Sequence, residues 1–184
     1  KTFFVYWALN SPHYPLQGTA KWRDYYKDIP SPRSKYNAFV STLDEKIGEM
    51  LTHLDRTGLT DNTIIIFQSD HGHSTEERTF FGGGSAGIYR GAKGCLFEGG
   101  IRVPSIITLP GVIPENQVRD QMVTGVDWFP TLAEFCRIKL PGHHIDGKSI
   151  KDVILNNSTN SPHETFYWHL GSGKNPEWVV REGD

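Results

Sequence analysis

Two side chains able to do chemistry stand just after an apolar run. Residues 63–67 read Thr-Ile-Ile-Ile-Phe, and Asp70, His71 and Gly72 follow shortly afterwards. An unbroken β-branched run is typical of a strand buried on both faces of a parallel sheet. Ligands meet such sheets at the carboxyl ends of the strands, so this carboxylate and imidazole are candidates to bind a metal or an anionic substrate. The plainer interpretation is that Asp70 only caps the turn that follows.

A glycine-rich loop after this turn carries two cationic side chains. Arg90 and Lys93 lie within residues 73–94, which hold Gly82, Gly83, Gly84, Gly87, Gly91 and Gly94. Such a loop can bring backbone N–H groups close to an oxyanion, or it can simply be mobile. The small neighbours of Lys93 would let its ammonium approach a substrate. Arg90 is a weaker candidate that could serve only to pin the loop.

A histidine near the start of the chain has a comparable place. Residues 2–10 form an apolar and aromatic run that predicts a buried strand, and His13 follows between two prolines. These prolines oppose helix formation and keep the loop extended. If the two strands run parallel, His13 faces the same sheet edge as Asp70. The alternative is a surface or core-capping histidine.

The elements expected to position these residues follow from hydrophobic periodicity. Residues 34–58 have helical spacing and end at a glycine. The order strand, helix, strand predicts a βαβ unit with a right-handed crossover. Residues 101–109 predict another strand, and residues 125–138 predict a second amphipathic helix capped by Asp127.

The last part of the chain has a different pattern. Residues 165–169 and 177–181 predict the two strands of a hairpin, with a turn at residues 171–174. The second strand looks cut short, which would leave an open edge. We therefore predict two parts, an α/β domain over residues 1–155 and a linker with a small antiparallel subdomain over residues 156–184.

Composition excludes some classes of partner. The 19 basic and 21 acidic residues give a formal charge of -2, so no overall field attracts nucleic acid or an anionic membrane. The longest apolar run, residues 3–9, is far shorter than the roughly 20 residues that span a bilayer. Cys95 and Cys136 are too few for a disulfide framework or a zinc site. We assign no role to His73, His143, His144 or His169.

The order of motifs resembles the second half of the formylglycine-dependent sulfatases. Residues 69–72 match Ser-Asp-His-Gly at the end of a strand, residues 93–94 match Lys-Gly, and residues 98–104 match Glu-Gly-Gly-Ile-Arg-Val-Pro. The His-Tyr-Pro loop at residues 13–15 and the Asp-x-x-Pro-Thr-Leu helix at residues 127–132 continue the resemblance. Several fixed residues in a fixed order over about 35 positions make a specific signal.

The resemblance implies a fold, a reaction and roles for the candidate residues. It implies an α/β fold of the alkaline-phosphatase-like superfamily, with a mostly parallel sheet flanked by helices, then the start of a small antiparallel subdomain. It also implies hydrolysis of a sulfate ester in a sulfated small molecule or glycan, at a periplasmic, extracellular or lysosomal location. Asp70 and His71 would be ligands of one calcium ion, His13 and Lys93 would be catalytic, and His13, Lys93 and Arg90 would bind the substrate.

The sequence also departs from that family. The formylglycine precursor motif, Cys or Ser followed by x-Pro-Ser-Arg, is absent, and so is the paired aspartate before it. Formylglycine and the N-terminal half of the domain are therefore expected outside this chain. One carboxylate and one imidazole are also too few for calcium, which prefers six to eight oxygens. We expect the chain alone neither to hydrolyse sulfate esters nor to hold calcium tightly.

Two alternatives stay open. A phosphodiesterase or phosphonate hydrolase of the same superfamily would use an Asp-His pair to bind zinc, and the imidazole of His71 suits zinc better than calcium. The other alternative is a non-catalytic domain that binds sulfated glycans through His13 and Lys93.

Overall fold

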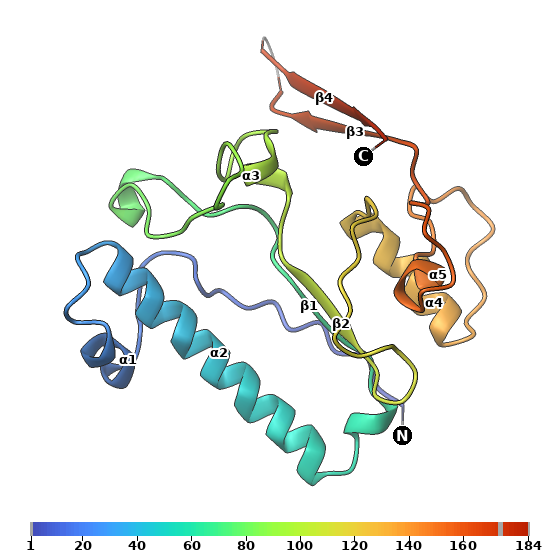
Figure 1. Ribbon diagram of the computed structural model, residues 1–184, viewed down its shortest axis with the longest axis horizontal. Helices are drawn as coiled ribbons and strands as arrows, with labels where there is room; N and C mark the ends of the chain where they lie inside the picture. Colours follow the sequence, from blue (N-terminus) through green and yellow to red (C-terminus); the bar gives the residue numbers. More distant parts are fainter. Residues whose placement is uncertain (1, 173–174, 184) are drawn as a thin grey trace. The chain divides into compact units, whose positions relative to one another are not determined.

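A computed structural model describes residues 2–172 and 175–183 of the chain (Figure 1). The chain divides into two compact units, which are described separately here. The first unit takes the described residues among 1–60 and 67–105, and the second takes those among 61–66 and 106–184. The candidate residues His13, Asp70, His71, Arg90 and Lys93 all belong to the first unit.

Two helices form the start of the first unit. The short helix α1 (Ala20–Tyr25) packs against the long helix α2 (Arg33–Arg56), which appears blue to cyan in Figure 1. Trp22 of α1 donates its indole N–H to Glu45 of α2 at 3.0 Å, and Lys21 forms an ion pair with the same carboxylate at 2.5 Å. Polar side chains as well as apolar ones therefore hold the two helices together.

The helix predicted from the hydrophobic periodicity of residues 34–58 is confirmed by α2. Ala38 and Phe39 are its buried residues, and Gly18 packs so closely on Ala38 that an added Cβ would lie 2.7 Å from the Ala38 carbonyl carbon. The helix ends just before Gly58, whose φ of 67° places it in the left-handed region that favours glycine.

Two short strands overlap the predicted strand runs. After the 3₁₀ turn η1 (Thr60–Asn62), β1 (Ile65–Gln68) pairs with β2 (Ser105–Thr108) in a two-stranded sheet. The side chains of both strands are half-buried or exposed, and Phe67 is 38% exposed. The prediction of a strand buried on both faces is therefore wrong for the structure of this chain.

The mostly parallel sheet is also not seen among the described residues. Ser69 donates its backbone N–H to Pro104, and Gly72 donates to Gly100, at 3.2 and 2.9 Å. The donor residue number rises from 69 to 72 while the acceptor residue number falls from 104 to 100, so the two segments run antiparallel. The described strands form only two two-stranded sheets. A parallel sheet would need further strands that are joined by crossover connections.

The predicted N-terminal strand does not form. Residues 2–10 have no strand assignment, and Phe4 and Tyr6 are 80% and 84% exposed. A strand needs a neighbouring strand to satisfy its backbone groups, and none of the described strands pairs with this run. Since its first strand is missing, the predicted βαβ unit is wrong as well.

The second unit has a small apolar core. After the 3₁₀ turn η3 (Gly125–Asp127), α4 (Trp128–Phe135) is followed by α5 (Lys151–Ile154), and these helices pack together. Three residues at α5 are buried at the centre of the core, and four partly buried residues pack against them: Ile150, Val153 and Ile154 with Ile107, Ile113, Trp128 and Phe135. The predicted second helix is confirmed, with its end at Phe135 rather than near residue 138.

The predicted hairpin is confirmed. Strands β3 (Thr165–Leu170) and β4 (Glu177–Glu182) are antiparallel, with Tyr167 opposite Val180 (Figure 1). His169 stacks on Trp178 across the pair with ring centroids 4.1 Å apart. The predicted turn includes residues 173–174, which lie outside the described residues.

None of the helices in the described part of the chain is both long enough and apolar enough to cross a bilayer.

Candidate functional site

Asp70 and His71 form a turn directly after β1. The Asp70 carboxylate accepts the backbone N–H of His71 at 3.0 Å, and its second oxygen lies 3.2 Å from His71 Nε2. The other ring nitrogen of His71 lies 2.8 Å from the Gly72 carbonyl oxygen. The Asp70 side chain is 83% exposed, so the carboxylate caps its turn and still faces outward. The capping and ligand interpretations of Asp70 both remain compatible with this geometry.

Gly72 is needed because two backbones cross at this turn. Its N–H donates to Gly100 at 2.9 Å, and a Cβ added at Gly72 would lie 1.9 Å from the Gly99 carbonyl oxygen. The residues at the crossing belong to α3 (Glu98–Ile101) and thus to the Glu-Gly-Gly motif. The two motifs are therefore joined by close backbone contact.

The glycine-rich loop uses several of its N–H groups within the protein. The N–H of Lys93 donates to the His73 carbonyl at 2.9 Å, and the N–H groups of Gly82 and Tyr89 donate to Thr79 and Ala86, both at 3.1 Å. These donors hold the loop together, so an anion bound here would have to use other donors.

The Lys93 ammonium is held by a carboxylate. Its Nζ lies 3.1 Å from an Oε2 of Glu76, which also accepts the Ser74 hydroxyl at 2.9 Å. Hydrogen bonds from Ser74 and from Lys93 lower the pKa of the Glu76 carboxyl below its ordinary value. Glu76 therefore stays charged at neutral pH and keeps Lys93 paired.

His13 is exposed and is tied to the same loop through its neighbour. Its Nδ1 lies 2.8 Å from the Tyr14 carbonyl oxygen, and the Tyr14 hydroxyl accepts a hydrogen bond from Arg78 at 2.5 Å. The Arg78 guanidinium also lies over the Tyr14 ring, 5.2 Å from its centroid. Arg78 belongs to the 3₁₀ turn η2 (Glu77–Thr79), two residues beyond Glu76.

The contacts of Arg90 are those of a residue that holds the loop in place. Its guanidinium lies over the Phe97 ring at 4.0 Å from the centroid, and its carbonyl accepts the N–H of Gly99. Glu98 and Arg102 form an ion pair at 3.1 Å, and the Arg102 guanidinium lies over the ring of Tyr89, a residue of the same loop. A role for Arg90 in substrate binding stays a prediction.

The structure brings the candidates onto neighbouring segments rather than into direct contact. Asp70 and His71 touch each other, and Lys93 is joined to this turn through His73. His13 is joined to the loop through Arg78. In the part of the chain that the structure describes, no hydrogen bond or ion pair joins Lys93 or His13 to Asp70. The roles assigned to these residues therefore stay predictions.

The metal site is incomplete within this chain. Among the described residues, no group of three or more His, Cys, Asp or Glu side chains is placed to hold a metal ion. Asp70 and His71 offer one carboxylate and one imidazole, and the imidazole already faces the carboxylate. These residues alone do not fit calcium, which takes six to eight oxygen ligands.

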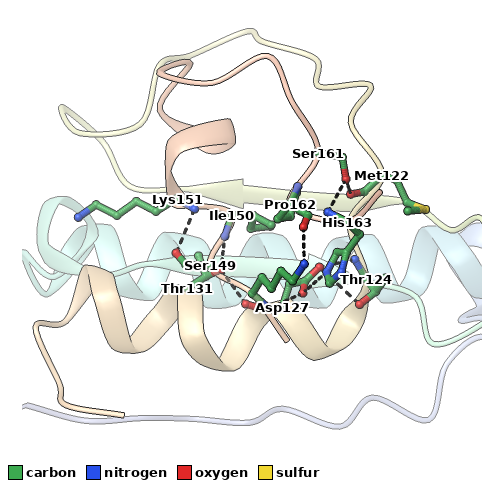
Figure 2. Close-up of polar contacts among 11 residues, drawn as sticks. Met122, Thr124, Asp127, Thr131, Ser149, Ile150, Lys151, Ser161, Pro162 and His163 are labelled. Carbon is green, nitrogen blue, oxygen red and sulfur yellow. Dashed lines mark hydrogen bonds and ion pairs between the residues drawn. The ribbon is translucent and has the colours of Figure 1, made fainter. Parts of the chain in front are cut away.

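The most buried polar cluster lies elsewhere, in the second unit (Figure 2). Asp127 is fully buried, and its Oδ1 lies 2.7 Å from Nε2 of His163, which is 5% exposed. The same oxygen accepts the N–H of Lys148 at 2.9 Å, and the other oxygen accepts the N–H of Thr124 at 2.8 Å. Every oxygen of this carboxylate therefore has protein donors.

The surrounding contacts extend the cluster along the chain. Thr131 donates to the Asp127 carbonyl and accepts the N–H of Ile150 at 3.0 Å, which ties α4 to the start of α5. The Lys148 ammonium donates a hydrogen bond to the Pro162 carbonyl at 2.8 Å. We name Asp127, Thr124, Lys148 and His163 the buried clamp, because together they hold three separate segments of the chain.

Sequence reasoning found only part of these arrangements. Asp127 does stand at the N-cap position of α4, but its side chain makes no cap hydrogen bond there; it is the N3 residue of a capping box whose cap is Thr124. Its partner His163 was not identified from the sequence. Glu76 and Arg78 were missed as well. A Ser-x-Glu spacing at residues 74–76 is the one local signal for Glu76, because a serine two residues before a carboxylate can bond to it.

Comparison with known proteins bears on the identity of the chain. The profile of the Sulfatase family matches residues 1–137. Steryl-sulfatase of Rattus norvegicus is 40% identical over 138 residues, which cover 73% of this chain and 24% of that protein. The chain thus spans about a quarter of that relative's length.

Solved structures agree with the sequence match. The crystal structure of Ps i-CgsB in complex with k-i-k-neocarrahexaose is similar with a TM-score of 0.84 and 26% identity, covering 94% of this chain and 38% of that one. The phosphonate monoester hydrolase of Agrobacterium radiobacter is similar with a TM-score of 0.58 and 25% identity, covering 75% and 25%.

The described chain thus has a mixed α/β fold that is similar to the folds of these two solved proteins. The profile match covers most of the chain, and its range includes residues 69–72 and 98–104. The chain belongs to the sulfatase family.

Proposed function

We propose that this chain is part of a sulfatase that hydrolyses sulfate esters and that its Lys93 binds the sulfate group. The observation that carries the proposal is the family match together with the loop that holds Lys93 beside the Asp70 turn. The ammonium of Lys93 can donate charge-assisted hydrogen bonds to sulfate oxygens. His13, on the exposed turn beside Tyr14, contacts the ester and protonates the departing alcohol.

Sulfated carbohydrate is the substrate class that we propose. Support comes from the structural similarity to Ps i-CgsB, whose complex contains k-i-k-neocarrahexaose. The similarity to steryl-sulfatase makes a sulfated sterol the comparison to test against it. By resemblance to the family, we also propose a periplasmic, extracellular or lysosomal location.

The remaining parts of the reaction are proposed to come from outside this chain. Asp70 and His71 supply two ligands of a calcium site that other residues complete, and formylglycine supplies the nucleophile in the other half of the domain. A bound cation would polarise that nucleophile and neutralise sulfate charge. We also propose that residues 1–155 are the α/β part and residues 156–184 the linker and antiparallel part.

Binding of sulfate by the chain is the direct test. We expect inorganic sulfate to shift the backbone amide signals of residues near Lys93 in a saturable way, and Lys93→Ala to weaken that binding about tenfold, because a charged hydrogen bond is lost. The measurement is a titration followed by nuclear magnetic resonance. Lys21→Ala is the matched control, since Lys21 is also paired with a carboxylate. Equal affinities in the two variants would overturn the role of Lys93.

Turnover by the chain alone is expected to be absent. Because the formylglycine motif is missing from residues 1–184, we expect no release of nitrophenol from a nitrophenyl sulfate ester above the level of a His13→Ala, Lys93→Ala double variant. Release that exceeds the double variant would show that this chain carries its own nucleophile.

Phosphonate or phosphodiester hydrolysis is the second candidate reaction, and the similarity to the Agrobacterium radiobacter enzyme favours it. It differs from the first in its metal, since the imidazole of His71 suits zinc. Zinc rather than calcium in the complete protein would favour this candidate.

A glycan-binding domain without catalysis is the third candidate, favoured by the absence of the nucleophile motif from this chain. Such a domain would bind a sulfated sugar and not its desulfated form, and the complete protein would show no turnover.

A further inference from the structure

Lys93 is the cation on which the proposed sulfate site depends, and a carboxylate already occupies it. Its Nζ lies 3.1 Å from Glu76 Oε2, and 28% of the lysine side chain is exposed. An anion that reaches Lys93 therefore meets a negative charge at the same ammonium. Like charges at such separations repel each other, and they do so more strongly at a partly buried site than in bulk water.

Glu76 is held in this position by its own segment. Ser74 donates its hydroxyl to the Glu76 carboxylate at 2.9 Å and accepts the backbone N–H of Glu76 at 3.3 Å. The serine thus fixes both the backbone and the side chain of Glu76. A carboxylate fixed in this way is not a chance surface contact of a long, freely rotating side chain.

Arg78 is the other cation of this segment, and it contacts Tyr14 rather than Glu76. Arg78 donates to the Tyr14 hydroxyl and lies over the Tyr14 ring, and its positive charge also contributes to the low pKa of the Glu76 carboxyl. Glu76 is therefore a single carboxylate with two nearby cations, of which only Lys93 touches it.

We propose that Glu76 is a competing carboxylate that occupies the place of a substrate sulfate oxygen on Lys93 and must be displaced when the substrate binds. This inference rests on the proposed function, because it takes Lys93 as the sulfate ligand. Its consequence is selectivity. An anion binds at Lys93 only if its own contacts there outweigh the contact that Glu76 makes.

The test compares two variants with the same change of charge. Glu76→Gln removes the carboxylate on Lys93, and Glu77→Gln removes an exposed carboxylate one residue further along. The first readout is the rate at which an amine-reactive acetylating reagent modifies Lys93, measured by mass spectrometry of the digested chain. We expect Glu76→Gln to be modified about two to five times faster than Glu77→Gln, the size expected when a partly exposed ion pair is removed.

The second readout is the affinity of the chain for inorganic sulfate. We expect Glu76→Gln to bind sulfate about two to five times more tightly than Glu77→Gln. Equal modification rates, or an equal or weaker affinity in Glu76→Gln, would overturn the inference.

The two proposals fail in different ways. If Lys93→Ala weakens sulfate binding but Glu76→Gln leaves it unchanged, the competing role of Glu76 is wrong and the proposed function stands. If Lys93→Ala has no effect on sulfate binding, the proposed role of Lys93 is wrong and this inference falls with it.

Discussion

Replacing Asp127 by alanine is expected to lower the free energy of unfolding of the second unit by about 1–3 kcal/mol for each buried donor that loses its acceptor. The variant leaves His163 without its partner in a site that is 5% exposed. It also removes the acceptor for the N–H groups of Lys148 and Thr124. The measurement is urea unfolding followed by near-ultraviolet circular dichroism.

The chain contains a matched control for this prediction. His144 and Asp146 form a second histidine–aspartate pair at 3.3 Å, but both side chains are more than four-fifths exposed, at 88% and 86%. Asp146→Ala is expected to change the free energy of unfolding by about 0–1 kcal/mol, as for other exposed pairs. If Asp127→Ala lowers the free energy of unfolding by no more than Asp146→Ala does, the buried clamp contributes no more to stability than an exposed pair. If Asp127→Ala does not fold, His163→Ala tests the same pair. That variant keeps the hydrogen bonds that the backbone N–H groups of Thr124 and Lys148 donate to the Asp127 carboxylate.

Gly72→Ala is expected to have the second largest effect, a loss of about 1–3 kcal/mol of unfolding free energy, as is typical when a close-packed position is overfilled. The new methyl group would lie 1.9 Å from the Gly99 carbonyl oxygen and 2.9 Å from its carbon, so one of the two backbones must move. Movement here breaks the hydrogen bond from Gly72 to Gly100 and shifts the Asp70 turn against the loop of Lys93. Urea unfolding and the exchange rate of the Gly72 amide measure the change.

Gly48→Ala is the control with the opposite sign. Gly48 lies in the middle of α2 with no atom within 4 Å of an added Cβ, so alanine there is expected to stabilise the helix by about 0.5–1 kcal/mol. A loss at Gly72 no larger than the experimental error would show that the crossing of the two backbones is looser than the structure indicates.

The elements that sequence reasoning predicted correctly are those determined by local pattern. The stripe of apolar residues in α2 and the two alternating runs of the hairpin depend on neighbours three or four, or two, positions away. Gly58 ends α2 for a local reason too, since its φ of 67° favours a residue without a side chain.

The failures concern partners that are distant in sequence. The apolar run at residues 2–10 has the composition of a strand, yet pairing depends on a neighbour, and no described strand pairs with it. The parallel sheet was inferred from buried-strand composition, which does not fix the direction of the partner. β1 instead continues into a segment that runs antiparallel to residues 100–104.

The candidate site shows the same division. The order of motifs selected His13, Asp70, His71 and Lys93 as candidates, and their roles stay predictions. The carboxylate that contacts Lys93 comes from 17 residues earlier, and the arginine that contacts Tyr14 comes from 64 residues later, so no local pattern indicates either contact. A resemblance of motifs can therefore select candidate residues, but it does not identify the side chains that contact them.

The buried clamp also has a kinetic consequence. Only six residues separate the two strands of the hairpin, so we expect their pairing to be a local event on the microsecond scale. The contact between Asp127 and His163 spans 36 residues, so we expect its closure to cost more chain entropy than the pairing of the strands. Because a two-stranded hairpin is only marginally stable in water, we expect its lasting order to depend on the contact of His163, which lies two residues before β3.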